Sequence, residues 1–163
     1  MELKKHFEWR YLFVGLYVLF FGIYIIVGLQ PVQATNYVKS AELEIPSIGL
    51  VSDVAETELK EYKLETPDEI VGSFTKAENK TLLIGHSTTV FQNLDEVKLG
   101  DEIIYDGKVY TVKKTVWSVK ERVHMGELIK REKEDTLVIM TCAGEMLRNG
   151  DATHRLIITA SIR

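Results

Sequence analysis

An uncharged run of 19 residues near the N-terminus, Tyr11 to Leu29, limits how this chain can fold. As a helix rising about 1.5 Å per residue, the run matches the roughly 30 Å hydrocarbon core of a bilayer. Three basic residues precede it, and no charged residue follows it until Lys39. Because Lys and Arg flanks stay on the cytoplasmic side, we predict a single-pass membrane helix with the N-terminus inside and the remaining chain outside the cell.

These features divide the chain into four segments. Residues 1–10 form the cytoplasmic N-terminus, 11–29 the transmembrane helix, 30–40 a polar linker and 41–163 an exported domain. A cleaved signal peptide is the alternative, because Val32-Gln33-Ala34 fits a small-residue cleavage site. The apolar run is longer than the usual signal core of about 7 to 15 residues, so we expect an uncleaved membrane anchor.

The exported segment consists of short apolar runs separated by turn residues. The clearest signal is Asp106-Gly107-Lys108 between Ile103–Tyr105 and Val109–Val112, because Asp-Gly between β-forming residues marks a hairpin. Other runs with strand character are 43–45, 48–54, 69–74, 81–84, 136–141 and 154–162. Helical spacing is confined to two short segments, 91–99 and 122–135. This pattern predicts a mainly β domain, either a barrel or a sandwich.

The composition narrows the classes of function. Acidic residues outnumber basic residues, 24 to 20, so nothing indicates a protein that binds nucleic acid. Cys142 is the only cysteine, and a single thiol cannot form a disulfide within the chain. It directly follows the apolar run 136–141. A lone thiol in an exported domain is therefore either incidental or chemically active.

A thiol nucleophile requires a group that exchanges its proton and a donor that stabilises the oxyanion formed by attack on an acyl carbon. The exported segment has three histidines, His86, His124 and His154. His86 ends an apolar run, as Cys142 does, so the two strand ends could meet on one rim. On the last strand, His154 and Arg155 point to opposite faces, and the pattern does not decide which of them faces the thiol.

Several of these segments resemble the signature of the sortase family. The resemblance rests on Thr141-Cys142 at the end of one strand, Gly85-His86 at the end of another, and Arg155 at the start of the last strand. Further similar segments are Ile45-Pro46-Ser47-Ile48, Phe91 with Leu94, and Leu99-Gly100-Asp101. The resemblance covers residues 41–163, and an exported domain behind an N-terminal anchor also fits it.

The resemblance implies an eight-stranded, sortase-like β-barrel with short helices in the connections. It also implies a cysteine transpeptidase that cleaves a sorting signal in other exported proteins. Cys142 would form a thioester with the substrate, and His86 would act first as general acid and then as general base. Arg155 would bind the substrate backbone and the oxyanion, while Thr141 would contribute to substrate binding beside the nucleophile.

The implied partners are an exported protein with a C-terminal sorting signal and an amine acceptor, such as a cell-wall precursor or a pilin subunit. No second apolar run follows Leu29, so we expect a type other than the pilin-polymerising sortases with a C-terminal anchor. No cofactor is implied, although some sortases bind calcium. Acidic residues that could do so here are Glu56, Glu58, Glu61, Asp68 and Glu69. A solvated acidic face is the simpler interpretation of these residues.

Two other functions are alternatives. An L,D-transpeptidase would use His124, which lies 18 residues before Cys142. Such enzymes have a histidine and a glycine directly before the cysteine, where this chain has Met140-Thr141. The other alternative is a catalytically inactive, membrane-anchored module that binds peptides. Arg148, in the polar loop after the cysteine, is the alternative to Arg155 as the cation of the site.

Overall fold

The structure of the chain, a computed structural model, describes residues 38–60 and 63–162. The predicted cytoplasmic N-terminus, the transmembrane helix and most of the predicted linker lie outside the described residues. Within the described part, no helix is long and apolar enough to cross a membrane.

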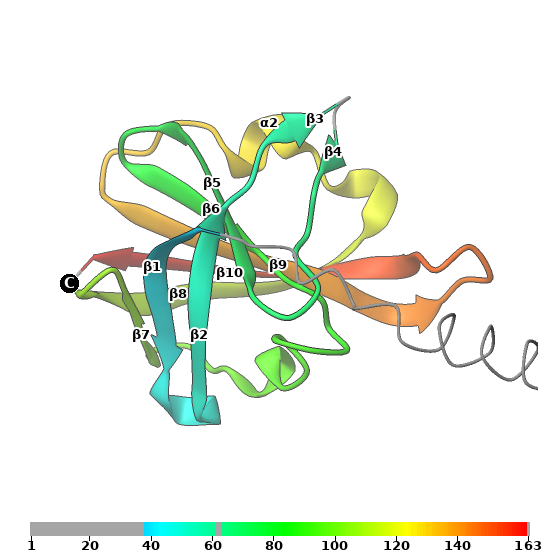
Figure 1. The fold of residues 1–163 in the computed structure, drawn as a ribbon, viewed down its shortest axis with the longest axis horizontal. Helices are drawn as coiled ribbons and strands as arrows, with labels where there is room; N and C mark the ends of the chain where they lie inside the picture. Colours follow the sequence, from blue (N-terminus) through cyan, green and yellow to red (C-terminus); the bar gives the residue numbers. More distant parts are fainter. Residues whose placement is uncertain (1–37, 61–62, 163) are drawn as a thin grey trace, which may run out of the picture. The chain divides into compact units, whose positions relative to one another are not determined.

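Eight strands close into a barrel in the order β1-β2-β5-β6-β9-β10-β8-β7, and β7 pairs back to β1 (Figure 1). The strands are β1 (Lys39–Ile45), β2 (Leu50–Glu56), β5 (Val71–Ala77), β6 (Lys80–Ile84), β7 (Glu102–Tyr105), β8 (Lys108–Val119), β9 (Thr136–Met146) and β10 (Ala152–Ile162). Most neighbours are antiparallel, but β2 pairs parallel to β5 and β6 pairs parallel to β9. The predicted eight-stranded β-barrel is confirmed.

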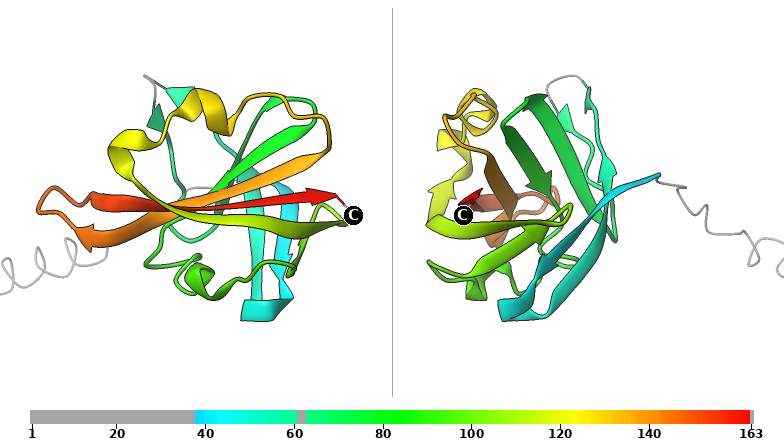
Figure 2. Two further views of the ribbon diagram at one scale, coloured as in Figure 1. Left: turned by 180° about the vertical axis from the view of Figure 1, so that it is seen from behind. Right: turned by 90° about the vertical axis from the view of Figure 1, so that its left-hand side faces the viewer.

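Short helices and one small hairpin occupy the connections. They are the 3₁₀ helices η1 (Pro46–Ile48), η2 (Leu94–Glu96) and η3 (Lys120–Arg122), the helix α2 (Met125–Leu128), and the hairpin of β3 (Leu59–Lys60) with β4 (Lys63–Leu64). The 3₁₀ helix η3 and α2 belong to residues 120–135, which we call the β8–β9 connection. This connection lies on the outside of the barrel (Figure 2).

The β7–β8 hairpin forms where the sequence predicts it. Tyr105 pairs with Lys108 across a two-residue turn, Asp106 and Gly107, whose φ angles are 48° and 72°. Positive φ at both central positions is the geometry of a type I′ turn, whose twist matches that of the paired strands.

The barrel wall is covered on both faces where β6 and β9 run side by side. Ile139 of β9 and Ile158 of β10 point into the barrel and are fully buried. Val138 points outward into a second apolar cluster, against which Leu128 of α2 packs. Burial on both faces explains why the run 136–140 is apolar without the alternation of a half-exposed strand.

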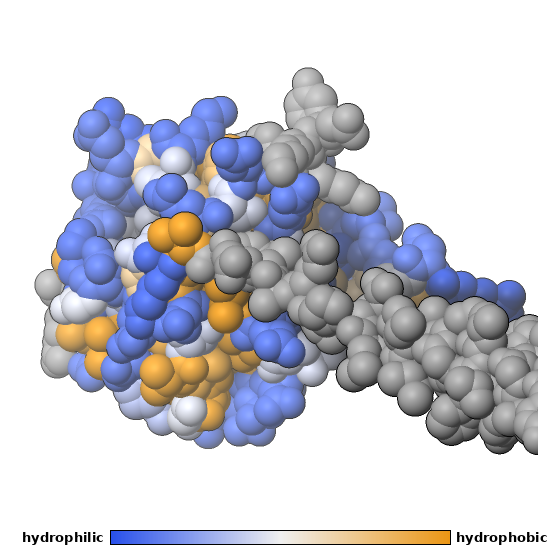
Figure 3. All heavy atoms as spheres, viewed as in Figure 1, coloured by the Kyte–Doolittle hydropathy of each residue, from blue (hydrophilic) through white to orange (hydrophobic). Residues whose placement is uncertain are grey.

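The surface of the described domain is mixed in polarity. Apolar and charged side chains lie next to one another on the face that carries β1 and β2 (Figure 3). Among the described residues, exposed apolar side chains include Val51 on β2, Leu99 before β7 and Trp117 on β8. Apolar side chains scattered in this way are normal on protein surfaces.

Tyr110 provides a test of the core through the alkaline stability of the protein. Burial, and then the nearby Asp135 carboxylate, raise the pKa of Tyr110 from its ordinary value near 10 to about 12. The stability that its neutral phenol contributes is complete below pH 10 and is lost as the pH rises through about 12. We expect the melting temperature of Tyr110→Phe to fall less than that of the wild type between pH 9 and pH 12. If the melting temperatures of the two proteins fall equally over this range, the pKa of Tyr110 is not the cause of the alkaline destabilisation.

Candidate active site

The pairing of β9 with β10 brings Cys142 and Arg155 together. The two residues are directly opposite each other in the antiparallel ladder. Side chains of directly opposite residues lie on the same face, with Cβ atoms about 4.5 to 5.5 Å apart. The thiol of Cys142 is free and partly buried. His154 pairs with Ala143, so the register decides the alternative that the sequence leaves open: Arg155, and not His154, shares the face of the thiol.

His86 reaches the same end of the sheet through the parallel pairing of β6 with β9. The last rung of this ladder joins Ile84 to Met140. One residue further, the Thr141 hydroxyl donates a buried hydrogen bond of 2.8 Å to the Gly85 carbonyl. Extending this register by another residue brings His86 to the level of Cys142.

Gly85 is required by close packing at the end of β6. A Cβ atom there would lie 2.6 Å from Cγ1 of Val90 and 2.7 Å from the ring of Phe91, which is too close for any side chain. Phe91 is buried, and its backbone N–H donates a 3.0 Å hydrogen bond to the His86 carbonyl. The backbone of His86 is therefore fixed both by Thr141 and by the turn that ends at Phe91.

One carboxylate lies near the imidazole of His86. Nε2 of His86 is 3.8 Å from Oδ1 of Asp68, and the two side chains are 42 % and 93 % exposed. The Thr89 hydroxyl donates a 2.7 Å hydrogen bond to the Asp68 carbonyl and so ties this loop to the His86 turn. The sequence indicated Asp68 only as an acid that could bind calcium. Among the described residues, which do not include Glu61, no group of three or more histidine, cysteine or acidic side chains could hold a metal ion.

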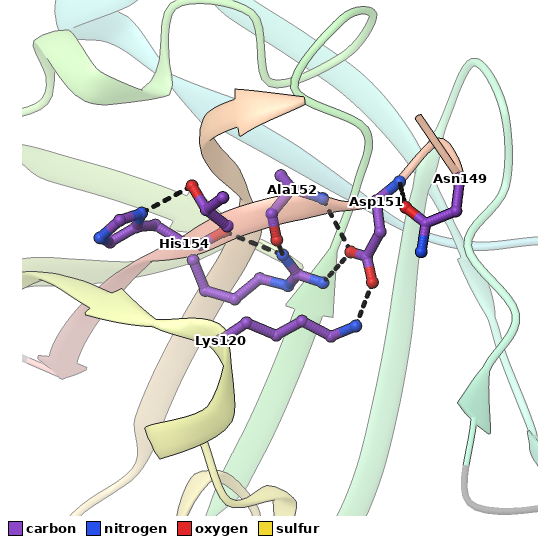
Figure 4. A network of polar contacts seen from close by, with 7 residues as sticks. Lys120, Asn149, Asp151, Ala152 and His154 are labelled. Atoms are coloured by element: carbon purple, nitrogen blue, oxygen red, sulfur yellow. Dashed lines mark hydrogen bonds and ion pairs between the residues drawn. The ribbon is translucent and has the colours of Figure 1, made fainter. Parts of the chain in front are cut away.

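The Arg155 side chain is held by a polar network at the start of β10 (Figure 4). Its Nη1 donates to the carbonyls of Ala152 and His154, at 3.0 and 2.9 Å, and its Nη2 donates to Oδ1 of Asp151 at 2.7 Å. The other oxygen of Asp151 pairs with Lys120. Hydrogen bonds from Lys120 and then from Arg155 hold the pKa of Asp151 well below its usual range. Asp151 and Lys120 are absent from the sequence-based prediction.

The other two histidines lie elsewhere. Nδ1 of His154 is 2.8 Å from the Thr153 hydroxyl, and both groups crowd Gly144, where a Cβ atom would lie under 3 Å from each. His124 directly precedes α2, is exposed and lines a cavity under the β8–β9 connection. Arg148 is exposed in the turn between β9 and β10.

A cavity of about 360 Å³ lies between the β8–β9 connection and the outer face of β8, β9 and β10. Val138 and Ile157 are among its apolar lining residues, and Ser118 also lines it. Ser118 is the β8 residue directly opposite Arg155. The cavity therefore begins beside Arg155 on the face of the sheet that also carries Cys142.

Comparisons with known proteins found a matching family model and similar solved structures. The family model described as "Sortase domain" matches residues 43–163. No curated protein sequence matches the chain.

Solved structures of similar fold include three sortases. Sortase C-1 from Actinomyces oris is 24% identical, with 77% of this chain and 72% of that chain covered and a TM-score of 0.60. Sortase C1 from Streptococcus suis is 23% identical, with 78% and 74% covered and a TM-score of 0.61. Sortase A from Corynebacterium diphtheriae is 22% identical, with 80% and 63% covered and a TM-score of 0.59. At these identities the similarity demonstrates a shared fold.

The Thr141 hydrogen bond can be tested without any substrate. Thr141→Val keeps the volume of the side chain but leaves the buried Gly85 carbonyl without its donor, which should lower the free energy of unfolding by about 1 to 3 kcal/mol. The Phe91 amide, which donates to the His86 carbonyl, should also exchange its hydrogen faster in this variant. Chemical denaturation and native-state hydrogen exchange measure the two effects.

Thr141→Ser is the matched control, because serine keeps the hydroxyl and loses only the methyl group. We expect the Phe91 amide to stay as protected in this variant as in the wild type. If the amide exchanges equally fast in the valine and serine variants, the hydroxyl does not hold the His86 turn.

Proposed function

The chain belongs to the sortase family, and from this membership we propose that it is a cysteine transpeptidase that acts on exported proteins. The observation that carries the proposal is the register of β9 with β10, which pairs Cys142 with Arg155. The end of β6 supports it, because the Thr141 bond to Gly85 aligns His86 with the same rim.

In the first step, the Cys142 thiolate attacks the carbonyl carbon of the scissile amide, and a C–S bond forms. The electron pair of the carbonyl moves to its oxygen, where N–H groups of Arg155 stabilise the negative charge. The C–N bond then breaks as the His86 imidazolium gives its proton to the leaving amine. The products are a thioester on Cys142 and the released C-terminal part of the substrate.

In the second step, an incoming amine attacks the thioester and gives a proton to His86. The C–S bond breaks, and the thiolate of Cys142 returns. Because the thioester retains the activation of the acyl group, the transfer needs no separate energy source, and we propose that it needs no cofactor. Thr141 contributes by holding the rim, while its role in substrate binding stays a prediction.

The proposed substrate is an exported protein with a C-terminal sorting signal. The proposed acceptor is an amine at the cell surface, such as a cell-wall precursor or a pilin subunit. One solved structure of similar fold is titled a pilus-related sortase C of Group B Streptococcus. Residues of the signal that precede the scissile bond would enter the cavity beside Arg155, which is lined by apolar residues such as Val138 and Ile157 together with charged side chains.

We also propose that residues 11–29 anchor the protein in the cell membrane with the domain outside. The basic residues before this run and the uncharged stretch after it support this orientation.

Substitution of the three proposed catalytic residues tests the reaction. With a library of sorting peptides and an amine, the full-length wild type in detergent should form a mass-shifted adduct on Cys142 and then the transfer product. Cys142→Ala should form neither. His86→Ala should lower the transfer rate by about 10²- to 10⁴-fold, and Arg155→Ala by about 10²- to 10³-fold.

The alternatives give different results in the same assay. Arg148→Ala is the matched control, because Arg148 is exposed in the turn between β9 and β10, and it should retain the wild-type rate. Loss of activity in His124→Ala but not in His86→Ala would favour an L,D-transpeptidase. Absence of an adduct with every peptide would favour an inactive peptide-binding module, and full activity of Arg155→Ala would remove the role proposed for that residue.

The single cysteine also tests the membrane orientation. A membrane-impermeant maleimide should label the chain in intact protoplasts, because Cys142 is its only cysteine and is partly exposed. The Cys142→Ala variant is the control, because any label that it takes up is not on the thiol. Labelling of the wild type that appears only after lysis would contradict an external domain.

A further inference from the structure

The guanidinium of Arg155 is largely shielded from water and is held on one side only. Its side chain is 14 % exposed. Of its five N–H groups, three donate to Ala152, His154 and Asp151. Among the described residues, the other two have no hydrogen-bond partner. The cation is thus fixed while two donors stay available.

Asp151 is the only charged partner of this guanidinium among the described residues. The bond from Nη2 to its carboxylate is charge-assisted, and such bonds are shorter and stronger than bonds to neutral carbonyls. A cation with so little exposure to water would be strongly destabilised if this carboxylate were removed. The position of the Arg155 side chain therefore depends on Asp151 more than on the two backbone carbonyls.

Asp151 is itself held in place. Its Oδ1 accepts a 2.8 Å hydrogen bond from the Ala152 N–H, and its backbone N–H donates to the Asn149 side chain at 3.2 Å. Its Oδ2 pairs with Lys120 at the start of the β8–β9 connection. The low pKa of Asp151, caused by Lys120 first and by Arg155 second, keeps the carboxylate charged at neutral pH.

We propose that Asp151 is a positioning residue that fixes the Arg155 guanidinium for the acyl oxygen formed at Cys142. The inference rests on the proposed function, in which Arg155 is the oxyanion donor. Asp151 touches neither the substrate nor the reacting atoms in this role. It holds one side of the guanidinium, so that the two remaining N–H groups are directed to one place rather than distributed over several side-chain conformations.

Single-turnover thioester formation with a sorting peptide tests the role in the full-length protein. Asp151→Ala should lower the rate constant by roughly 10- to 100-fold, as expected for a misplaced group, and leave the peptide KM within about twofold. Asp151→Asn keeps the shape and an acceptor oxygen, so its loss should be smaller. Asp53→Ala is the matched control and should retain the wild-type rate. Asp53 of β2 also forms an ion pair, with Lys39 of β1.

A double-mutant cycle separates positioning from a general effect on stability. If Asp151 acts only through Arg155, Asp151→Ala should cause no further loss in the Arg155→Ala background. Multiplicative losses would overturn the inference, and so would a wild-type or increased rate in the single Asp151→Ala variant.

Arginine side-chain NMR keeps the test independent of the reaction. In the wild type, the bonds to Nη1 and Nη2 should slow rotation about the guanidinium and give separate signals for Arg155. These signals should merge in Asp151→Ala. In Asp151→Asn, which also serves if the alanine variant does not fold, they should move closer together, because a neutral acceptor holds the guanidinium less strongly than a carboxylate. Unchanged signals would overturn the inference, whereas absence of a thioester in the wild type together with merged signals would count against the proposed function alone.

Discussion

The proposed chemistry depends on the antiparallel register between β9 and β10. Because side chains alternate between the two faces of a strand, a slip of one residue would replace Arg155 by one of its neighbours opposite Cys142. Buried pairs inside the barrel, such as Ile139 with Ile158, oppose this slip because it would turn apolar side chains into water. Beyond Cys142 a bulge at Gly144, with φ 78°, shifts the register, and the pairing resumes at Met146 with Ala152. Core packing thus decides which cation accompanies the thiol.

Much of this arrangement could be predicted from the sequence, because it follows from local patterns. The Asp106-Gly107 turn has a short-range signal, and so do apolar runs that end at His86 and Cys142. The choice between His154 and Arg155 has no short-range signal in the sequence. Either residue could share the face of the thiol until the register between the two strands is known. The family resemblance indicated Arg155, and the register gives the physical reason.

The network around Arg155 could not be predicted from residue spacing. Lys120 and Asp151 lie 31 residues apart and meet only because β8 and β10 are neighbours. Asp151 precedes Arg155 by four residues, a spacing that on a straight strand separates Cα atoms by about 13 Å. The carboxylate reaches the guanidinium because Asp151 lies in the turn before β10 and the arginine side chain folds back toward that turn. Such contacts arise from tertiary structure.

The interior of the barrel is filled, and the groups proposed to react lie on its outer face, where exclusion of water would need a cover. The β8–β9 connection lies over the cavity on this face and is tied to the barrel at both ends. At one end, the buried ammonium of Lys80 bonds to the Glu132 carboxylate at 3.1 Å and the Glu127 carbonyl at 3.3 Å. At the other end, Lys120 pairs with Asp151, which holds Arg155. Hydrogen bonds to a developing oxyanion are stronger where water is excluded, so in the proposed reaction this connection would contribute to the same electrostatic stabilisation as the guanidinium. The ion pair at Asp151 therefore links the wall of the cavity to the proposed oxyanion donor.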